Sequence, residues 1–98
     1  MTVGDLSLNR STYELLYHGE TRSLSGREFQ IMEILMQRPG FVVTTDVFLS
    51  HVWGWNSEVD ISVVWVHISN IRKKLNQLKA PVEIRFIRGA GYVLEVGK

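Results

Sequence analysis

Apolar and polar residues alternate with different periods along the chain, and each change of period marks an expected element. Residues 3–24 alternate with a period of two, and turn-forming residues interrupt them at 9–11 and 18–19. This pattern predicts three short strands of an antiparallel meander, over residues 3–8, 12–20 and 21–24. The meander is too polar to be stable alone, so we expect it to lie against the rest of the chain.

A helical period begins at Ser25. The sequence SGRE matches a capping box, in which Ser25 and Glu28 each accept a hydrogen bond from the other's backbone amide. Apolar residues then recur over a wide arc as far as Pro39-Gly40. This breadth is typical of a central core helix, which we predict over residues 25–38.

A second, shorter helix is expected over residues 44–53, after an extended link at 41–43. Thr44 or Thr45 can act as its N-cap, and Gly54 ends it. Residues 54–59 then form a loop.

The segment VDISVVWVHISNIRKKLNQL, residues 59–78, is rich in β-branched residues, which are typical of strands. Its apolar residues nevertheless recur at steps of three and four: Ile61, Val64, Ile68, Ile71, Leu75 and Leu78. A strand would bury Asn70, Arg72 and Lys74 together. Burying each apolar residue contributes ~1.5–3 kcal/mol, which outweighs the loss in helix propensity. We therefore predict a helix over 60–78, capped by Asp60, with an outer face that carries Ser62, Val66, Asn70, Lys73 and Gln77.

Alternation returns after Pro81 and predicts a hairpin over residues 82–97. Ile84 and Phe86 on one strand face Tyr92, Leu94 and Val96 on the other, with Gly89 and Gly91 at positive-φ turn positions. The expected fold class is α+β. The element order suits a winged helix-turn-helix with an N-terminal antiparallel β-meander over 1–24, three helices and a C-terminal β-hairpin wing, as one domain over 1–98.

Composition excludes several classes of protein. The 98 residues are 45% hydrophobic, with no cysteine, so a disulfide scaffold and a thiolate metal site are excluded. The chain has no apolar run of about 18 residues and no signal pattern at its N-terminus. We therefore expect a cytoplasmic protein without a membrane partner.

The net charge of +1 hides an asymmetry along the chain. Residues 1–66 hold four arginines against eight acids, a net charge of −4, whereas residues 67–98 carry a net charge of +5. Such a split indicates a polyanionic partner for the C-terminal third, although a solvated basic face is the alternative.

The outer face of the 60–78 helix has the chemistry of a DNA contact. The major groove admits one helix, where Asn70 can pair with adenine and Val63 or Val66 can touch a thymine methyl group. Lys73 and Lys74 would meet phosphates. Arg88, at the shoulder of the hairpin turn, suits a minor groove or a phosphate.

Trp65 lies at the boundary of this face and has two interpretations. It can pack at the domain edge with Arg72 stacked on it. Alternatively, exposed Trp55, Val63 and Trp65 could anchor a protein partner, which would make the chain a winged-helix interaction module with little DNA affinity.

Catalysis has the least support. His18 and His51 are expected at the surface or at caps, and no histidine pair has metal-ligand spacing. Ser50 and His51 are adjacent, but adjacency does not place a hydroxyl against an imidazole. We find no paired carboxylates and no cofactor loop, so we expect no enzyme, no metal, no cofactor and no small-molecule substrate.

The motifs SGREFQIMEIL, PGFVVT, VWGW, VHISNIRKKL and IRGAGYVLE together resemble the winged-helix effector domains of OmpR/PhoB-type response regulators, over nearly the whole chain. The resemblance implies a third helix that recognises direct-repeat DNA, self-association on that DNA, and control of transcription in a phosphorelay. The implied DNA contacts are Trp53, Ser62, Val63, Val66, His67, Ser69, Asn70, Lys73, Arg88 and Tyr92. Lys74 is added to them as the phosphate contact predicted above from the helix itself. A solvated surface position is the alternative for His67. The implied RNA polymerase contact is the loop Gly54, Trp55, Asn56, Ser57 and Glu58.

The chain departs from that family's pattern at the start of the third helix. Ser62-Val63 stand where Arg-Thr is frequent, Trp65 where an acid is frequent, and Ser69-Asn70 where basic residues are frequent. We therefore expect fewer phosphate anchors and more reliance on Lys73, Lys74 and the wing. The family implies a receiver domain upstream, so we interpret the chain as an excised effector fragment, with a naturally receiver-less protein as the alternative.

Overall fold

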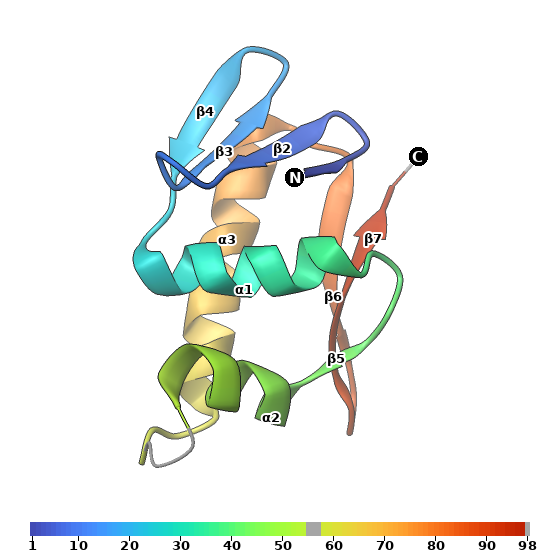
Figure 1. Cartoon of the computed structure of the whole chain (residues 1–98). Helices are drawn as coiled ribbons and strands as arrows, with labels where there is room; N and C mark the ends of the chain where they lie inside the picture. Colours follow the sequence, from blue (N-terminus) through green and yellow to red (C-terminus); the bar gives the residue numbers. More distant parts are fainter. Residues whose placement is uncertain (55–57, 98) are drawn as a thin grey trace.

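The computed structural model describes residues 1–54 and 58–97. Its elements follow in the order β1 (Thr2–Val3), β2 (Leu6–Asn9), β3 (Glu14–Tyr17), β4 (Glu20–Ser23), α1 (Gly26–Gln37), β5 (Val43–Thr44), α2 (Thr45–Phe48), η1 (Leu49–Trp53), α3 (Ser62–Leu78), β6 (Val82–Ile87) and β7 (Gly91–Val96). An N-terminal sheet lies across α1 and one end of α3, and α2 lies at the other end of α3 (Figure 1). The C-terminal hairpin runs beside these helices, with its tip at the α2 end. The expected α+β winged-helix fold is confirmed.

The N-terminal sheet has four antiparallel strands in the order β1-β2-β3-β4, one more than the expected three. The first expected strand is divided by a turn at Gly4, whose φ of 58° suits glycine, and Val3 pairs with Leu6 across that turn. Leu6, Leu8 and Leu15 are buried and join the common core. The sheet thus gains its stability from the helices beneath it, as its polar composition predicts.

Helix α1 begins at the predicted capping box. Ser25 Oγ accepts from the Glu28 amide at 3.2 Å, and Glu28 Oε1 accepts from the Ser25 amide at 2.8 Å. The helix buries a broad apolar face that includes Ile31, Met32 and Leu35, none of which is exposed to solvent. It is therefore the central core helix that the sequence indicates.

Thr44 rather than Thr45 caps the second helix, because its hydroxyl accepts from the Val47 amide at 3.4 Å. The helix continues beyond Phe48 as the π-helical turn η1 and stops at Gly54, which has a φ of 98°. The two segments together cover the region predicted as one helix.

The segment rich in β-branched residues is helical, as its spacing predicts. Along α3, Val64, Ile68, Ile71, Leu75 and Leu78 are buried. Ile61 differs from the prediction: it precedes the first helical residue and its side chain is exposed. The predicted cap also differs: the N-cap residue is Ile61, which makes no side-chain cap hydrogen bond. Asp60 stands one residue earlier, and its Oδ1 accepts from the Ser62 amide at 2.9 Å.

The extended link at 41–43 contributes a strand that the sequence did not indicate. Val43 and Thr44 pair with Tyr92 and Gly91, so β5 joins the hairpin in a three-stranded sheet ordered β5-β7-β6. Gly89 has a positive φ of 77°, as predicted, but Gly91 does not. Gly91 is required for another reason, because a Cβ there would overlap the Val43 carbonyl group.

Candidate nucleic-acid interface

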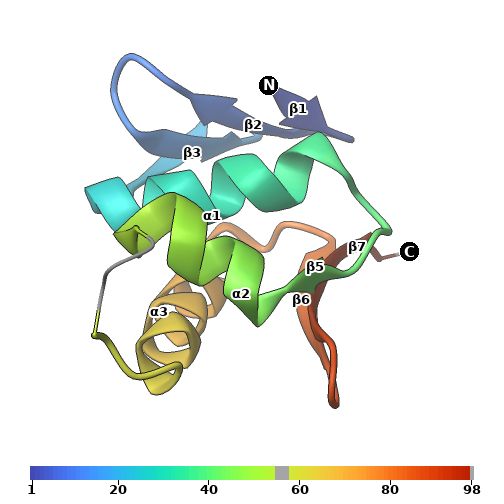
Figure 2. The same ribbon diagram turned by 60° about the horizontal axis from the view of Figure 1, so that its bottom comes forward.

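The outer face of α3 and the tip of the β6–β7 hairpin project on the same side of the molecule (Figure 2). Ser62, Val66, Asn70 and Lys73 are exposed on α3, while Val63 and Ser69 are half-buried. The buried stripe of α3 turns these side chains outward because successive residues are about 100° apart on a helix. The structure therefore brings most of the predicted helix contacts onto one accessible surface.

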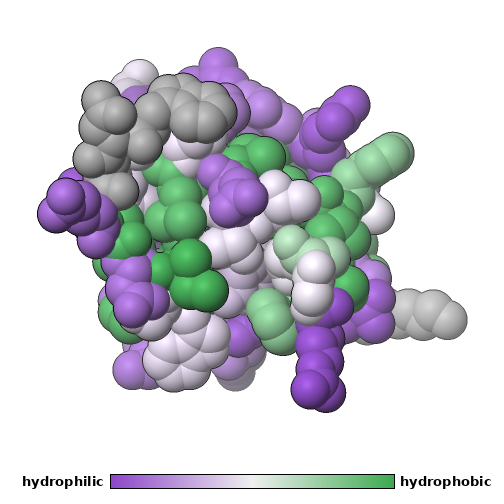
Figure 3. Space-filling model, turned by 90° about the horizontal axis from the view of Figure 1, so that it is seen from below, coloured by the Kyte–Doolittle hydropathy of each residue, from purple (hydrophilic) through white to green (hydrophobic). Residues whose placement is uncertain are grey.

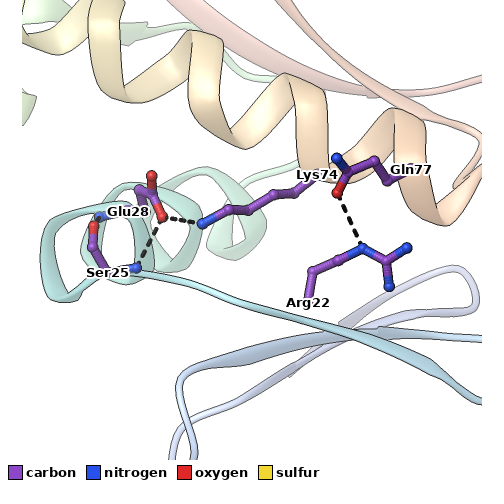
Figure 4. Close-up of polar contacts among 5 residues, drawn as sticks. All are labelled: Arg22, Ser25, Glu28, Lys74 and Gln77. Atoms are coloured by element: carbon purple, nitrogen blue, oxygen red, sulfur yellow. Dashed lines mark hydrogen bonds and ion pairs between the residues drawn. The ribbon is translucent and has the colours of Figure 1, made fainter.

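Polar contacts hold α3 at a defined rotation about its own axis (Figure 4). The Lys74 ammonium lies 2.6 Å from Glu28 Oε1, the same oxygen that accepts the α1 capping bond from Ser25. A turn further along α3, Gln77 Oε1 accepts from Arg22 Nε of β4 at 3.1 Å. These contacts tie α3 to the start of α1 and to the N-terminal sheet.

The Glu28 carboxylate is buried in charged form at the centre of this arrangement. Burial raises its pKa, but the Lys74 hydrogen bond, the Ser25 amide and the Lys74 charge together hold the pKa below its ordinary value. The carboxylate is thus ionised at neutral pH, and it keeps Lys74 directed toward α1.

This placement changes the expectation for Lys74. Its ammonium points to α1 and is committed to Glu28, whereas neighbouring Lys73 is exposed. Lys74 therefore positions the helix, and the phosphate contact expected of it has no geometric support. Helical periodicity already sets Lys73 opposite the buried stripe and Lys74 at the edge of that stripe. That the Lys74 ammonium meets Glu28 depends on how α1 packs against α3, which the sequence pattern does not show.

Trp53 and His67 lie together at the junction of η1 and α3. Their rings meet edge to face with centroids 5.2 Å apart, and the Arg27 guanidinium lies 5.1 Å from the Trp53 ring centroid. His67 Nδ1 lies 2.8 Å from the Val63 carbonyl oxygen. Both rings are half-buried, so His67 is not the solvated surface histidine of the alternative. Their contact with a DNA backbone stays a prediction.

The wing presents Arg88 to solvent beside the turn at Gly89. Tyr92 behaves differently: it is only 4% exposed, and its ring packs against Phe48 and Phe86 with centroids 6.1 and 5.3 Å away. Burial raises the pKa of its hydroxyl, partly opposed by the Arg72 charge. Tyr92 is therefore a core residue that supports the wing, and its ring does not stand on the exposed surface expected of a contact.

Arg72 has a role that the sequence did not reveal. Its Nε and Nη2 both donate to the Ile84 carbonyl oxygen, at 2.9 and 2.6 Å, so it ties α3 to the outer edge of β6. The predicted stacking of Arg72 on Trp65 is wrong, and Trp65 is 56% exposed. A groove between α3 and β6 has Arg72 and Phe86 among its lining residues.

The predicted polymerase-contact loop is described only at its ends. Gly54 and Glu58 are exposed, whereas Trp55, Asn56 and Ser57 lie outside the described residues. Within the described residues, no helix has the length and apolar character needed to cross a membrane.

Comparisons with known proteins support this arrangement. Residues 19–94 match the family described as "Transcriptional regulatory protein, C terminal". The heme response regulator HssR of Staphylococcus aureus (strain JH9) is 38% identical over 95 residues, which cover 97% of this chain and 42% of HssR. The chain thus spans less than half the length of that relative.

Two solved structures are similar over nearly their whole lengths. The DNA-binding domain of CpxR from E. coli has a TM-score of 0.82 and 31% identity, covering 100% of this chain and 97% of that one. The DNA-binding domain of RstA from Klebsiella pneumoniae, solved in complex with the RstA box, has a TM-score of 0.78 and 27% identity, covering 97% and 95%. The chain belongs to the family of C-terminal domains of transcriptional regulatory proteins.

Proposed function

We propose that this domain binds specific sequences in double-stranded DNA, as the effector domain of a two-component response regulator that controls transcription. The observation that carries the proposal is the common exposure of Asn70, Lys73 and Val66 on α3. The N-terminal end of this helix and the tip of the wing project at the same end of the molecule (Figure 2). The names of HssR, CpxR and RstA support the same function. They do not favour the alternative of a protein-interaction module.

The exposed side chains suit the two grooves of a duplex. With α3 in the major groove, Asn70 can pair with the N6 and N7 atoms of adenine, and the Lys73 ammonium can neutralise a phosphate. The wing then lies over the adjacent minor groove, where Arg88 meets a phosphate or enters the groove. The +5 charge of residues 67–98 provides the long-range attraction to DNA.

The remaining parts of the proposal concern partners. The expected site is a direct repeat, on which two copies of the domain self-associate. The loop at 54–58 would contact RNA polymerase, and its exposed ends at Gly54 and Glu58 suit such a role. A domain that acts on bacterial DNA in this way would work in the cytoplasm.

A salt titration with point variants tests the proposal. Affinity for a duplex selected from a random library is measured between about 50 and 200 mM salt. Counterion release predicts a fall of log K with log salt of about 0.9 per neutralised phosphate, so Lys73→Ala lowers the slope by about that amount. Asn70→Ala should lose about 1–3 kcal/mol of binding free energy on the selected site and far less on unrelated DNA.

Matched controls separate these effects from general damage. Asn76→Ala removes an exposed asparagine from the same helix, nearer the N-terminal sheet. Arg10→Ala removes an exposed cation from the turn after β2. Both variants should bind like the wild type. Absence of binding at low salt, or a flat salt response, would contradict the proposed function.

A further inference from the structure

An apolar patch lies on the exposed side of the first turns of α3. Ile61, Trp65 and Val66 are 62%, 56% and 47% exposed. Ile61 stands just before α3 with helical backbone angles, four residues from Trp65, so these two side chains are neighbours. Val66 lies about 100° from Trp65 around the helix axis, on the adjoining side. Isolated exposed apolar residues are common, but three within six residues make the start of α3 unusually apolar for a surface proposed to face DNA.

The underside of the molecule shows the same character (Figure 3). Hydrophobic and near-neutral side chains occupy much of this face, onto which the N-terminal end of α3 and the wing tip both open. Val66 belongs both to this patch and to the proposed DNA interface.

The same stretch lacks cations. Residues 62–69 contain no lysine and no arginine, and the one titratable side chain, His67, is half-buried with Nδ1 2.8 Å from the Val63 carbonyl oxygen. The next cations along α3 are Arg72, committed to Ile84, and the free Lys73. The first two turns thus cannot gain affinity from phosphates as Lys73 does.

The base edges in the major groove carry a single kind of apolar group, the C5-methyl group of thymine. We propose that Trp65, with Ile61 beside it, is a specificity-determining residue that contacts thymine methyl groups. The target half-site then carries thymines opposite the first two turns of α3. This inference rests on the proposed DNA-binding function, and it assigns to Trp65 a role in selecting the sequence.

Replacing single thymines by deoxyuridine tests the inference, because this change removes only the methyl group. The chain of 98 residues is titrated against its selected duplex and against a set of duplexes with one thymine replaced in each. The wild type should lose about fourfold in affinity for each contacted methyl group. Trp65→Ala should bind on the order of tenfold more weakly and become insensitive to deoxyuridine at those positions. Trp65→Leu should keep part of the sensitivity.

Phe41→Ala provides the matched control. Phe41 is 63% exposed and lies between α1 and β5, away from α3, so its removal should change neither affinity nor methyl sensitivity. Trp65→Ala should keep the wild-type salt slope, because no phosphate contact is lost.

The proposal is overturned if deoxyuridine leaves wild-type affinity unchanged or if Trp65→Ala retains the full methyl sensitivity. A reduced salt slope in Trp65→Ala would also overturn it, since that result indicates a backbone contact. Failure of the wild type to bind any duplex at low salt is a distinct result, which rejects the proposed function itself.

Discussion

The buried ion pair between Glu28 and Lys74 offers a quantitative test of how α3 is held. The two groups are 2.6 Å apart, and their side chains are only 6% and 27% exposed. Glu28→Gln removes the charge but keeps one side-chain oxygen, and in the wild type a single oxygen, Oε1, accepts from both Ser25 and Lys74. Because a hydrogen bond to a charged group contributes about 1.5–3 kcal/mol, we expect this change to cost about 1.5 kcal/mol of unfolding free energy.

Lys74→Met should cost more, about 3 kcal/mol, because it leaves a buried carboxylate with only the Ser25 amide as partner. The double variant Glu28→Gln/Lys74→Met should lose less than the sum of the two single losses, by about 1–2 kcal/mol, since neither charge is then left unpaired. Urea unfolding of the four proteins at pH 7 measures this coupling.

The pH dependence supplies a second readout. The pKa of Glu28 is lower in the folded state than in the unfolded state. The stability that the Glu28 carboxylate provides is therefore fully present above its unfolded-state pKa of about 4.3, and it is lost as the pH falls through the folded-state pKa. The penalty of Glu28→Gln should therefore be largest at pH 7 and shrink below about pH 4. A coupling under about 0.5 kcal/mol, or a penalty that does not change with pH, would refute the reasoning.

Three further predictions concern the core and the wing. Ile68→Ala removes a fully buried side chain and should lower the unfolding free energy by about 2–5 kcal/mol. Val66→Ala, at an exposed position of the same helix, should change it by less than about 0.5 kcal/mol. Equal losses in chemical denaturation would contradict the outward face of α3. Gly91→Ala should lower the unfolding free energy by about 1–3 kcal/mol, and the melting temperature by several degrees, because the added Cβ overlaps the Val43 carbonyl group. An unchanged melting temperature would contradict that close approach. Arg72→Met should cost about 1–3 kcal/mol and speed amide exchange in β6; wild-type exchange rates there would exclude the edge contact.

Local patterns were sufficient to predict most of the elements. The capping box at Ser25 and the steps of three and four along α3 depend on neighbours within one or two turns, so the sequence carries them directly. The outward placement of Asn70 and Lys73 follows from the same periodicity, because burying Val64, Ile68 and Ile71 leaves the opposite face in water. The family resemblance named the type of domain.

Other features depended on residues far apart in the sequence, and only the tertiary structure decided them. Lys74 pairs with Glu28, which is 46 residues away, so Lys74 and exposed Lys73 have different roles despite being adjacent. Gly91 is needed because β5 approaches it, and Tyr92 is buried because α2 packs over the wing. Helical periodicity and caps are determined by local backbone geometry. The partner that covers a polar side chain at the edge of a buried stripe, as Glu28 covers Lys74, is determined by the packing of distant elements.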